Sequence, residues 1–366
     1  MLKIINIVGA RPNFMKIAPL VKAMACHQDV ESCLVHTGQH YDDKLSDVFF
    51  KQLGIPSPDI NLGIGSASRE EQITRISAAF EPIVIEQRPD AVLVVGDVNS
   101  TIACARVAKA HGVKVVHVEA GLRSFDPSMP EEINRVETDQ ISDYLFVTEE
   151  SGMENLEKES VPGKRFLVGN CMIDTLVQNF EQVQASGILA QLKLSGQRYI
   201  VATFHRPSNV DSREALSRLV AILQQLCHRT KLVLPLHPRT RKSAENFGLL
   251  ATLEALPGLL LTEPLGYHDF IRLVRDAMVV VTDSGGIQEE STYLRVPCLT
   301  MRENTERPVT VTIGTNTLLG SDGSALLAAV DSVIRGDYKK GAIPPLWDGR
   351  AAERIVDILR RELQAG

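Results

Sequence analysis

Acidic side chains stand at the ends of two consecutive apolar segments, where they could exchange protons with a substrate. Asp97 ends AVLVVGD, and Glu119 ends VVHVE in the next segment. Glu131 and Arg135 follow in PEEINR, one helical turn apart, and would share one face of a helix. Carboxylates held close together can have raised pKa values and can serve as general acid and base. The alternatives are that each acid caps a helix or pairs with Arg123, and that PEEINR is an ordinary surface ion-pair pattern.

The segment DSGGIQEE carries the clearest signal for binding a phosphate. Ser284 could cap a helix whose first turn, Gly285 and Gly286, exposes backbone N–H groups without side-chain obstruction. Such a helix end binds a diphosphate. Glu290, further along the same helix, could accept hydrogen bonds from ribose hydroxyls. For SGG alone, a tight turn between strand and helix that binds nothing is an equally good interpretation.

Basic side chains and histidines follow several other apolar segments and favour an anion as the ligand. The candidates are Arg11 and Lys16 in GARPNFMK, His205 and Arg206 in HRPSN, His237 in HPRT, and Arg302 and Arg307 in RENTERP. Solvated surface bases are the alternative for the first pair. A histidine at a strand end is more often a structural donor than a catalyst. We therefore favour a structural role for His237. The neighbouring Arg206 favours a functional role for His205.

The elements that must position these residues are short apolar segments that alternate with helical stretches. Continuous apolarity without alternation is typical of strands buried on both faces of a parallel sheet. The predicted strands are residues 3–9, 91–97, 113–121, 144–150, 199–205, 231–237, 278–286 and 297–301. The predicted helices include residues 17–24, 70–85, 101–111, 213–227 and 267–275. Because ligands bind at the carboxyl ends of parallel strands, the polar residues that follow them should line the site.

The alternating pattern occurs twice, which predicts two doubly wound, Rossmann-like α/β domains that face each other across a cleft. A chain of 366 residues is also longer than one ordinary domain. We place the first domain, with the catalytic carboxylates, at residues 1–172, and the second, which would bind the nucleotide, at residues 173–349. A C-terminal helix, 350–366, is expected to join the first domain.

Composition and motif searches exclude several classes of protein. The net charge of −6 argues against a general nucleic-acid binder. The six cysteines lie far apart without zinc-like spacing. No segment approaches the ~20 apolar residues of a membrane span, so we expect a cytoplasmic protein without membrane contact. The motifs of NAD sites, P-loops, zinc proteases and serine nucleophiles are also missing, so we predict no cofactor and no metal.

Eight motifs in one order resemble the non-hydrolysing UDP-N-acetylglucosamine 2-epimerases. They are GARPNFMK, TGQHYD, GDVNST, HVEAGLRSFDPSMPEEINR, HRPSNVD, LPLHPRT, TDSGGIQEE and RENTERP, between residue 9 and about residue 316. The resemblance implies a fold like that of B-type glycosyltransferases, a homodimer, and neither a metal nor a tightly bound nicotinamide. It implies catalytic roles for Asp97, Glu119, Glu131 and His205. It implies that the UDP-sugar is bound by Arg11, Lys16, Arg135, Ser284, Gly285, Gly286, Glu290 and Arg307. Arg206 and His237 are added to the predicted substrate-binding residues because each follows a predicted strand.

The implied reaction interconverts UDP-GlcNAc and UDP-ManNAc, which would supply ManNAc units for cell-surface polysaccharide. UDP would leave by anti elimination to give 2-acetamidoglucal and would then add back. The alternatives are a 2-epimerase for a related sugar such as a UDP-2,3-diacetamido sugar, an epimerase that releases UDP and ManNAc, a glycosyltransferase, and a sensor without turnover. Arg307 favours the N-acetylglucosamine enzymes. Tyr41 and Ser208 depart from the pattern of members that their own substrate activates, which puts such activation in doubt.

Overall fold

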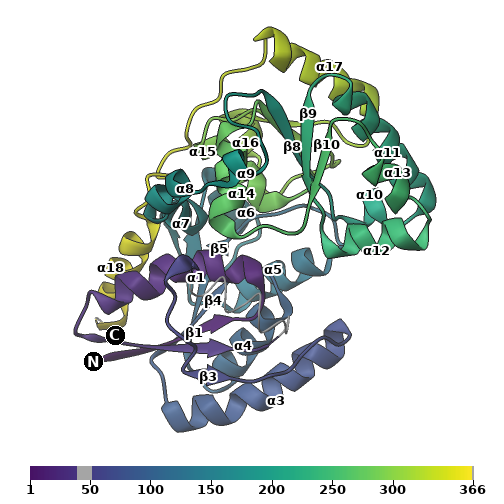
Figure 1. The fold of residues 1–366 in the computed structure, drawn as a ribbon. Helices are drawn as coiled ribbons and strands as arrows, with labels where there is room; N and C mark the ends of the chain where they lie inside the picture. Colours follow the sequence, from purple (N-terminus) through teal and green to yellow (C-terminus); the bar gives the residue numbers. More distant parts are fainter. Residues whose placement is uncertain (39–51, 365–366) are drawn as a thin grey trace. The chain divides into compact units, whose positions relative to one another are not determined.

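The apolar segments form two parallel β-sheets, each in its own unit of the chain. The computed structural model describes residues 1–38 and 52–364, and the side chains of residues 11 and 12 are outside this description. Within these residues the first sheet has the strand order β3-β2-β1-β4-β5-β6-β7, and the second has the order β10-β9-β8-β11-β12-β13. The first unit comprises Met1–Gln178 and Pro345–Gly366, and the second comprises Asn179–Pro344 (Figure 1).

The first unit alternates strands and helices through most of its length. Its strands are β1 (Leu2–Val8), β2 (Val30–His36), β3 (Ile60–Asn61), β4 (Ala91–Val95), β5 (Lys114–Ala120), β6 (Tyr144–Val147) and β7 (Lys164–Leu167). Its helices are α1 (Arg11–Ala25), α3 (Arg69–Gln87), α4 (Asn99–Ala110), α5 (Pro130–Ile141), α6 (Glu150–Lys158), α7 (Cys171–Gln178) and α18 (Ala351–Gln364). The division expected between residues 172 and 173 falls inside α7.

The second unit repeats the alternation. Its strands are β8 (Tyr199–Thr203), β9 (Lys231–Pro235), β10 (Leu259–Thr262), β11 (Val279–Thr282), β12 (Cys298–Thr300) and β13 (Asn316–Leu318). Its helices are α8 (Phe180–Ala185), α9 (Ile188–Gln191), α10 (Pro207–Val210), α11 (Arg213–Cys227), α12 (Pro238–Asn246), α13 (Leu250–Glu254), α14 (Tyr267–Asp276), α15 (Gly285–Tyr293), α16 (Val309–Thr312) and α17 (Gly323–Arg335).

The strand order of both sheets reverses at one point, as the doubly wound prediction requires. In the first sheet β1 pairs with β2 on one side and with β4 on the other, and all of these pairs are parallel. In the second sheet β8 pairs with β9 and β11 in the same way. Loops that follow the strands at such a reversal leave opposite faces of the sheet and leave room for a ligand at the carboxyl ends. Asp97, His205 and Ser284 follow strands at these two points.

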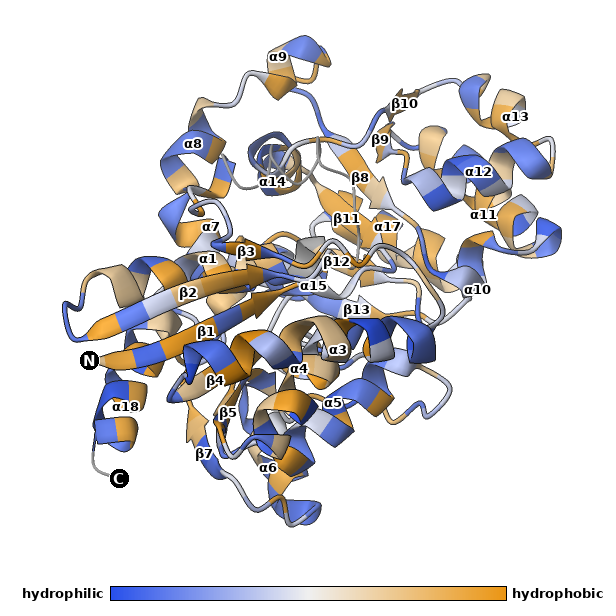
Figure 2. Ribbon diagram, turned by 90° about the horizontal axis from the view of Figure 1, so that it is seen from below, coloured by the Kyte–Doolittle hydropathy of each residue, from blue (hydrophilic) through white to orange (hydrophobic). Residues whose placement is uncertain are grey.

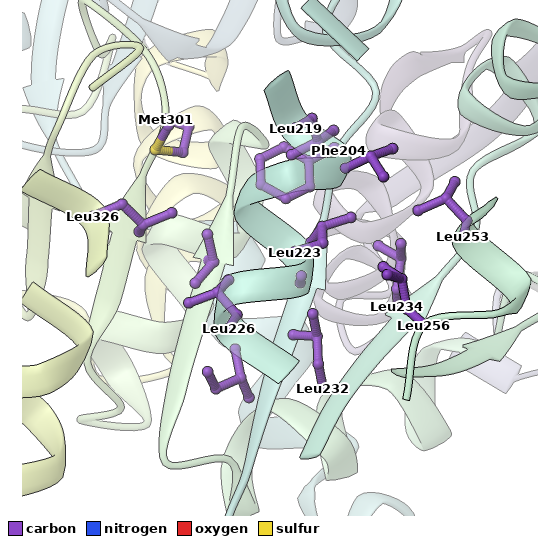
Figure 3. Close-up of a cluster of buried hydrophobic side chains, with 14 of the residues drawn as sticks. Phe204, Leu219, Leu223, Leu226, Leu232, Leu234, Leu253, Leu256, Met301 and Leu326 are labelled. Atoms are coloured by element: carbon purple, nitrogen blue, oxygen red, sulfur yellow. The ribbon is translucent and has the colours of Figure 1, made fainter. Parts of the chain in front are cut away.

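Apolar burial explains why these segments become central strands. Every residue of β4 is buried, and so is every residue of β11. Figure 2 shows both strands in hydrophobic colours, whereas α3 shows hydrophobic and hydrophilic residues side by side. In the second unit, Phe204, leucines of α11 and leucines of β9 form one cluster with Met301 and Leu326 (Figure 3). Two central strands of this kind bring the polar residues behind them to fixed positions.

The C-terminal segment returns to the first unit and is anchored there by polar contacts. The buried Trp347 donates from Nε1 to the carbonyl of Thr148 at 3.1 Å. The Asp174 carboxylate accepts hydrogen bonds from Ala351 N at 3.1 Å and Ala352 N at 2.6 Å, at the start of α18. Burial raises the pKa of Asp174 to about 6. Helix α18 then packs against α1 (Figure 1). Among the described residues, no helix is long and apolar enough to cross a membrane.

Candidate active site

Glu119 occupies an irregular position in β5 that turns its side chain toward α1. The pairing of β5 with β6 shifts by one residue between Val118 and Ala120, and Glu119 has a φ of +71°. Such a bulge with a left-handed residue is costly for a glutamate, and it re-aims the side chain. The Glu119 carboxylate accepts a hydrogen bond from Lys16 Nζ at 2.6 Å, and both side chains are buried. The strained backbone therefore places this acid against a cation.

Gly96 leaves the room that this ion pair needs. It precedes Asp97 at the end of β4 and has a φ of +67°. A Cβ atom at this position would lie 2.8 Å from Lys16 Nζ and 3.6 Å from Glu119 Oε1. Any larger residue would therefore push Lys16 away from the acid.

Arg135 of α5 connects the two acids that end neighbouring strands. Its buried guanidinium forms an ion pair with Asp97 and lies 4.0 Å from the Glu119 carboxylate. The preceding residue, Asn134, donates from Nδ2 to the backbone carbonyl of Asp97 at 2.9 Å. The structure thus brings four predicted site residues, Lys16, Asp97, Glu119 and Arg135, into one cluster.

The partner of Arg135 on its own helix is Glu132, and not Glu131 as the spacing suggested. The Arg135 guanidinium lies 3.7 Å from Glu132. Glu132 also accepts hydrogen bonds from the backbone N of Ser124 at 2.8 Å and of Phe125 at 3.0 Å, so it fixes the loop between β5 and α5. Glu131 is half-buried and, within the described part of the chain, makes no side-chain hydrogen bond or ion pair.

In the second unit, a buried aspartate holds the segment that carries His205. Asp283 follows β11 and is fully buried. It accepts hydrogen bonds from the backbone N of His205 at 3.1 Å and of Arg206 at 3.0 Å, and from Asn209 Nδ2 at 3.0 Å. It also lies 3.2 Å from His205 Nδ1. Burial alone would raise the pKa of Asp283, but its hydrogen bonds outweigh this effect and the pKa is lowered.

The ring of His205 is therefore oriented by a carboxylate on one nitrogen, which leaves Nε2 for other contacts. The ring also stands 5.0 Å, centroid to centroid, from the ring of His237. His237 begins α12 and accepts at Nδ1 from the backbone N of Arg239 at 3.2 Å. Arg206 is half-buried, and its Nε has no hydrogen-bond partner among the described residues.

The start of α15 combines open backbone with a buried cation. Ser284 is the residue before the first turn, as predicted, but its side chain makes no capping hydrogen bond. A Cβ atom on Gly285 would lie 2.8 Å from Nη1 of Arg307, so glycine lets the guanidinium lie against the helix end. Arg307 forms ion pairs with Glu289 at 2.9 Å and with Glu306 at 3.4 Å. Amide groups of a first turn beside a guanidinium suit an anion such as a diphosphate.

Comparison with known proteins decides the family. A family model described as UDP-N-acetylglucosamine 2-epimerase matches residues 22–360. The chain belongs to this family.

Relatives of the epimerase family match nearly the whole chain. A UDP-N-acetylglucosamine 2-epimerase homolog from Methanococcus maripaludis is 41% identical and the match covers 98% of this chain and 99% of that protein. A UDP-2,3-diacetamido-2,3-dideoxy-D-glucuronate 2-epimerase from Pseudomonas aeruginosa is 39% identical, with coverage of 98% and 100%. The crystal structure of Methanocaldococcus jannaschii UDP-GlcNAc 2-epimerase in complex with UDP-GlcNAc and UDP has a TM-score of 0.91 at 38% identity, with coverage of 98% and 100%. The predicted family and the predicted two-domain α/β fold are confirmed.

One residue of the site was not predicted from the sequence, and two residues that the sequence analysis named lie wholly or partly outside the described part of the chain. Asp283 was missed, although it stands at the end of a predicted strand as Asp97 does. Arg11 begins α1, but its side chain lies outside the described residues, and Tyr41 falls in the undescribed stretch 39–51. Within the described residues no group of three or more His, Cys, Asp and Glu side chains is placed to hold a metal ion.

Glu290 is a buried acid of α15 with an unused hydrogen-bonding atom. It is 4% exposed, and its Oε1 has no hydrogen-bond partner among the described residues. Burial, followed by the charge of Glu289, raises the pKa of Glu290 to about 8. An acid of this kind is largely protonated near neutral pH and can exchange hydrogen bonds with the hydroxyls of a sugar.

The raised pKa of Glu290 predicts a pH-dependent loss of stability. Its pKa in the fold, about 8, lies above the ordinary value of 4.5, so its contribution is fully present below about pH 4.5 and is lost as the pH rises through 8. Glu290→Gln keeps the shape and cannot ionise. Denaturant unfolding at pH 5 and pH 8.5 should show the variant gaining several kcal/mol over the wild type at the higher pH, since one pKa unit is about 1.4 kcal/mol.

Glu254→Gln provides the matched control for this measurement, because Glu254 is exposed on α13 of the same unit. Its stability relative to the wild type should be the same at both pH values. If Glu290→Gln behaved like this control, Glu290 would ionise in the fold at an ordinary pH.

Proposed function

We propose that this chain is an isomerase that interconverts UDP-GlcNAc and UDP-ManNAc without net hydrolysis. The observation that carries the proposal is the cluster at the ends of β4 and β5. There a bulge brings Glu119 to Lys16, and Arg135 connects Glu119 with Asp97. Two carboxylates fixed beside cations can take up and return a proton, and the family membership identifies the kind of substrate.

The reaction requires more than proton carriers, because the hydrogen at C2 of the sugar has no neighbouring carbonyl. Departure of UDP from C1 gives that carbon oxocarbenium character and makes the C2 hydrogen acidic. Removal of the proton then gives 2-acetamidoglucal. Return of a proton to the other face of C2, and addition of UDP to C1, gives the epimer.

The two units are proposed to divide these tasks. Asp97, Glu119 and Glu131 of the first unit carry protons, and Arg135 orients the carboxylates. The start of α15 and Arg307 bind the diphosphate and stabilise its negative charge as the C1–O bond breaks. His205, held by Asp283, together with Arg206, Arg11 and Lys16, adds donors for the same charge. His237 and Glu290 complete the proposed set of substrate contacts.

Incubation with UDP-GlcNAc in heavy water tests the proposal directly. We expect deuterium at C2 of both UDP-GlcNAc and UDP-ManNAc, because the carried proton exchanges with solvent before it returns. Proton NMR of the same sample would also show free ManNAc and UDP if the enzyme hydrolysed its substrate. A glycosyltransferase would leave the C2 hydrogen in place, and a sensor would leave the sugar unchanged. The absence of deuterium at C2 would refute the epimerase proposal.

A related sugar is the second candidate substrate, because the Pseudomonas aeruginosa relative that acts on a 2,3-diacetamido glucuronate is 39% identical. Parallel assays with that UDP-sugar and with UDP-GlcNAc would separate the two. Arg307 favours UDP-GlcNAc, so we expect the higher kcat/KM with it.

We further propose that the enzyme is a cytoplasmic homodimer that supplies ManNAc units for cell-surface polysaccharide. Light scattering after size-exclusion chromatography would give the mass, to be compared with 40.2 kDa for one chain.

A further inference from the structure

A fully buried histidine lies close to the carboxylate cluster, and each of its ring nitrogens faces a hydrogen-bond acceptor among the described residues. His117 belongs to β5 and stands two residues before Glu119. Its Nδ1 lies 2.7 Å from Oδ1 of Asp139, a residue of α5. Its Nε2 lies 2.8 Å from the backbone carbonyl of Gly96, the residue before Asp97. Nε2 thus contacts the backbone beside Asp97, and Nδ1 contacts helix α5.

These contacts fix the orientation of the His117 ring. A carbonyl oxygen can only accept, so Nε2 must donate to Gly96, and Nδ1 then faces the Asp139 carboxylate. Burial alone would raise the pKa of Asp139, but His117 and Arg123 outweigh burial and the pKa is lowered. His117 of β5 thus links Asp139 of α5 to the backbone of Gly96.

Asp139 reaches both sides of the Glu119 bulge. Through His117 it holds the residue two positions before Glu119, and its Oδ2 accepts a hydrogen bond from the backbone N of Gly121, two positions after it, at 3.1 Å. The same oxygen forms an ion pair with Arg123 at 2.7 Å. Arg123 in turn donates to Glu159 from Nε at 2.8 Å and from Nη2 at 2.7 Å. Arg123 thus stands between the carboxylates of Asp139 and Glu159.

We infer that Asp139 and His117 are positioning residues that fix the separation and direction of the Asp97 and Glu119 carboxylates. The hydrogen-bonded pair of His117 and Asp139 clamps the strained backbone on both sides of Glu119. Through the Gly96 carbonyl it also fixes the start of the loop that carries Asp97. Helix α5 carries both Asp139 and Arg135, so the same helix sets the backbone and the cation between the two acids. The inference rests on the proposed roles of Asp97 and Glu119.

Steady-state kinetics of Asp139→Asn test the inference. The amide keeps the shape but loses the charge that holds His117 and Arg123. We expect kcat to fall about 10–100-fold, because a shift of about 1 Å in a reacting group can cost about 100-fold in rate. KM for UDP-GlcNAc and the Kd for UDP, measured by calorimetry, should stay within about twofold. Misplaced acids should also return the proton less efficiently, so more turnovers should release UDP and 2-acetamidoglucal.

Asp143→Asn is the matched control. Asp143 accepts a hydrogen bond from the backbone N of Val115 at 2.9 Å, and so anchors the other end of β5. This variant should lose stability but keep kcat and the release of glycal within about twofold of the wild type. A lower folded fraction alone changes the active concentration, and it changes neither KM nor the fraction of turnovers that release glycal.

A second variant keeps the test decisive if Asp139→Asn does not fold. His117→Gln removes the imidazole but leaves Asp139 with Arg123 and Gly121, and the same fall in kcat is expected. Wild-type kcat in the folded fraction of either variant would overturn the inference, and so would failure of both to fold, which would show a purely structural role. If Glu119→Gln kept full turnover, the proposed role of Glu119 would fail instead, whereas the absence of C2 exchange in the wild type would refute the proposed function.

Discussion

Replacing Glu119 with glutamine is expected to lower kcat about 10²–10⁴-fold, the range by which a general acid or base accelerates a reaction. The amide has the same shape but cannot carry a proton at neutral pH. Because Glu119 belongs to the carboxylate cluster and not to the start of α15, the Kd for UDP should stay within about threefold. Deuterium incorporation at C2, measured by NMR, and calorimetry with UDP would follow the two quantities separately.

Asp97→Asn and Glu131→Gln should behave in the same way if each acid carries a proton. Glu86→Gln, on the exposed side of α3 in the same unit, is the control and should keep the wild-type kcat. Glu131→Gln is the more demanding test of the proton-carrier assignment, because the structure shows no contact between Glu131 and the carboxylate cluster. If a variant that lacks all three acids still exchanged the C2 hydrogen, none of the three would be the required proton carrier.

Removing Arg135 should produce the largest loss of stability among the site variants. Its buried guanidinium is an ion-pair partner of Asp97 and Glu132 and lies 4.0 Å from Glu119. Arg135→Met fills much of the same space but leaves three acids without this cation. Loss of one partner of a buried ion pair typically costs about 3–5 kcal/mol. Urea unfolding should show a decrease of that size, together with loss of turnover.

Arg75→Met is the control for this variant. Arg75 pairs with Glu71 on the exposed face of α3, and an exposed pair of this kind contributes roughly 0.3–0.5 kcal/mol. Arg135→Met could instead lose as little stability as Arg75→Met. That result would mean that Lys16 and solvent compensate the three carboxylates when Arg135 is absent.

The sequence was sufficient to predict the central strands and the amphipathic helices. Helix α11 was predicted at residues 213–227 and is observed at Arg213–Cys227, where Ser212 accepts a hydrogen bond from the backbone N of Ala215. Edge strands were harder to predict, because they need no continuous apolarity. Strand β7 has the sequence KRFL and strand β13 has the sequence NTL, and neither is long or apolar enough to stand out.

The rule that ligands bind at the carboxyl ends of strands was sufficient to predict that Asp97 and Glu119 lie close together. It could not show the bulge at Glu119, because a positive φ at a glutamate has no signal in the sequence. The partners that hold the site were also invisible. Asp283 lies 78 residues from His205, and Asp139 lies 22 residues from His117. The first pair is set by the pairing of β8 with β11 and the second by the packing of β5 on α5, and no local spacing predicts either.

The return of the chain from the second unit to the first has a consequence for how the protein is made. During translation the second unit, Asn179–Pro344, leaves the ribosome before Pro345–Gly366 does. The face of α1 that receives α18, and the residues of the first unit that surround Trp347, therefore stay uncovered until Pro345–Gly366 has been synthesised. The first unit begins to be synthesised before the second unit but can complete its fold only after it. A nascent chain halted near residue 344 would therefore present apolar surface to chaperones and proteases.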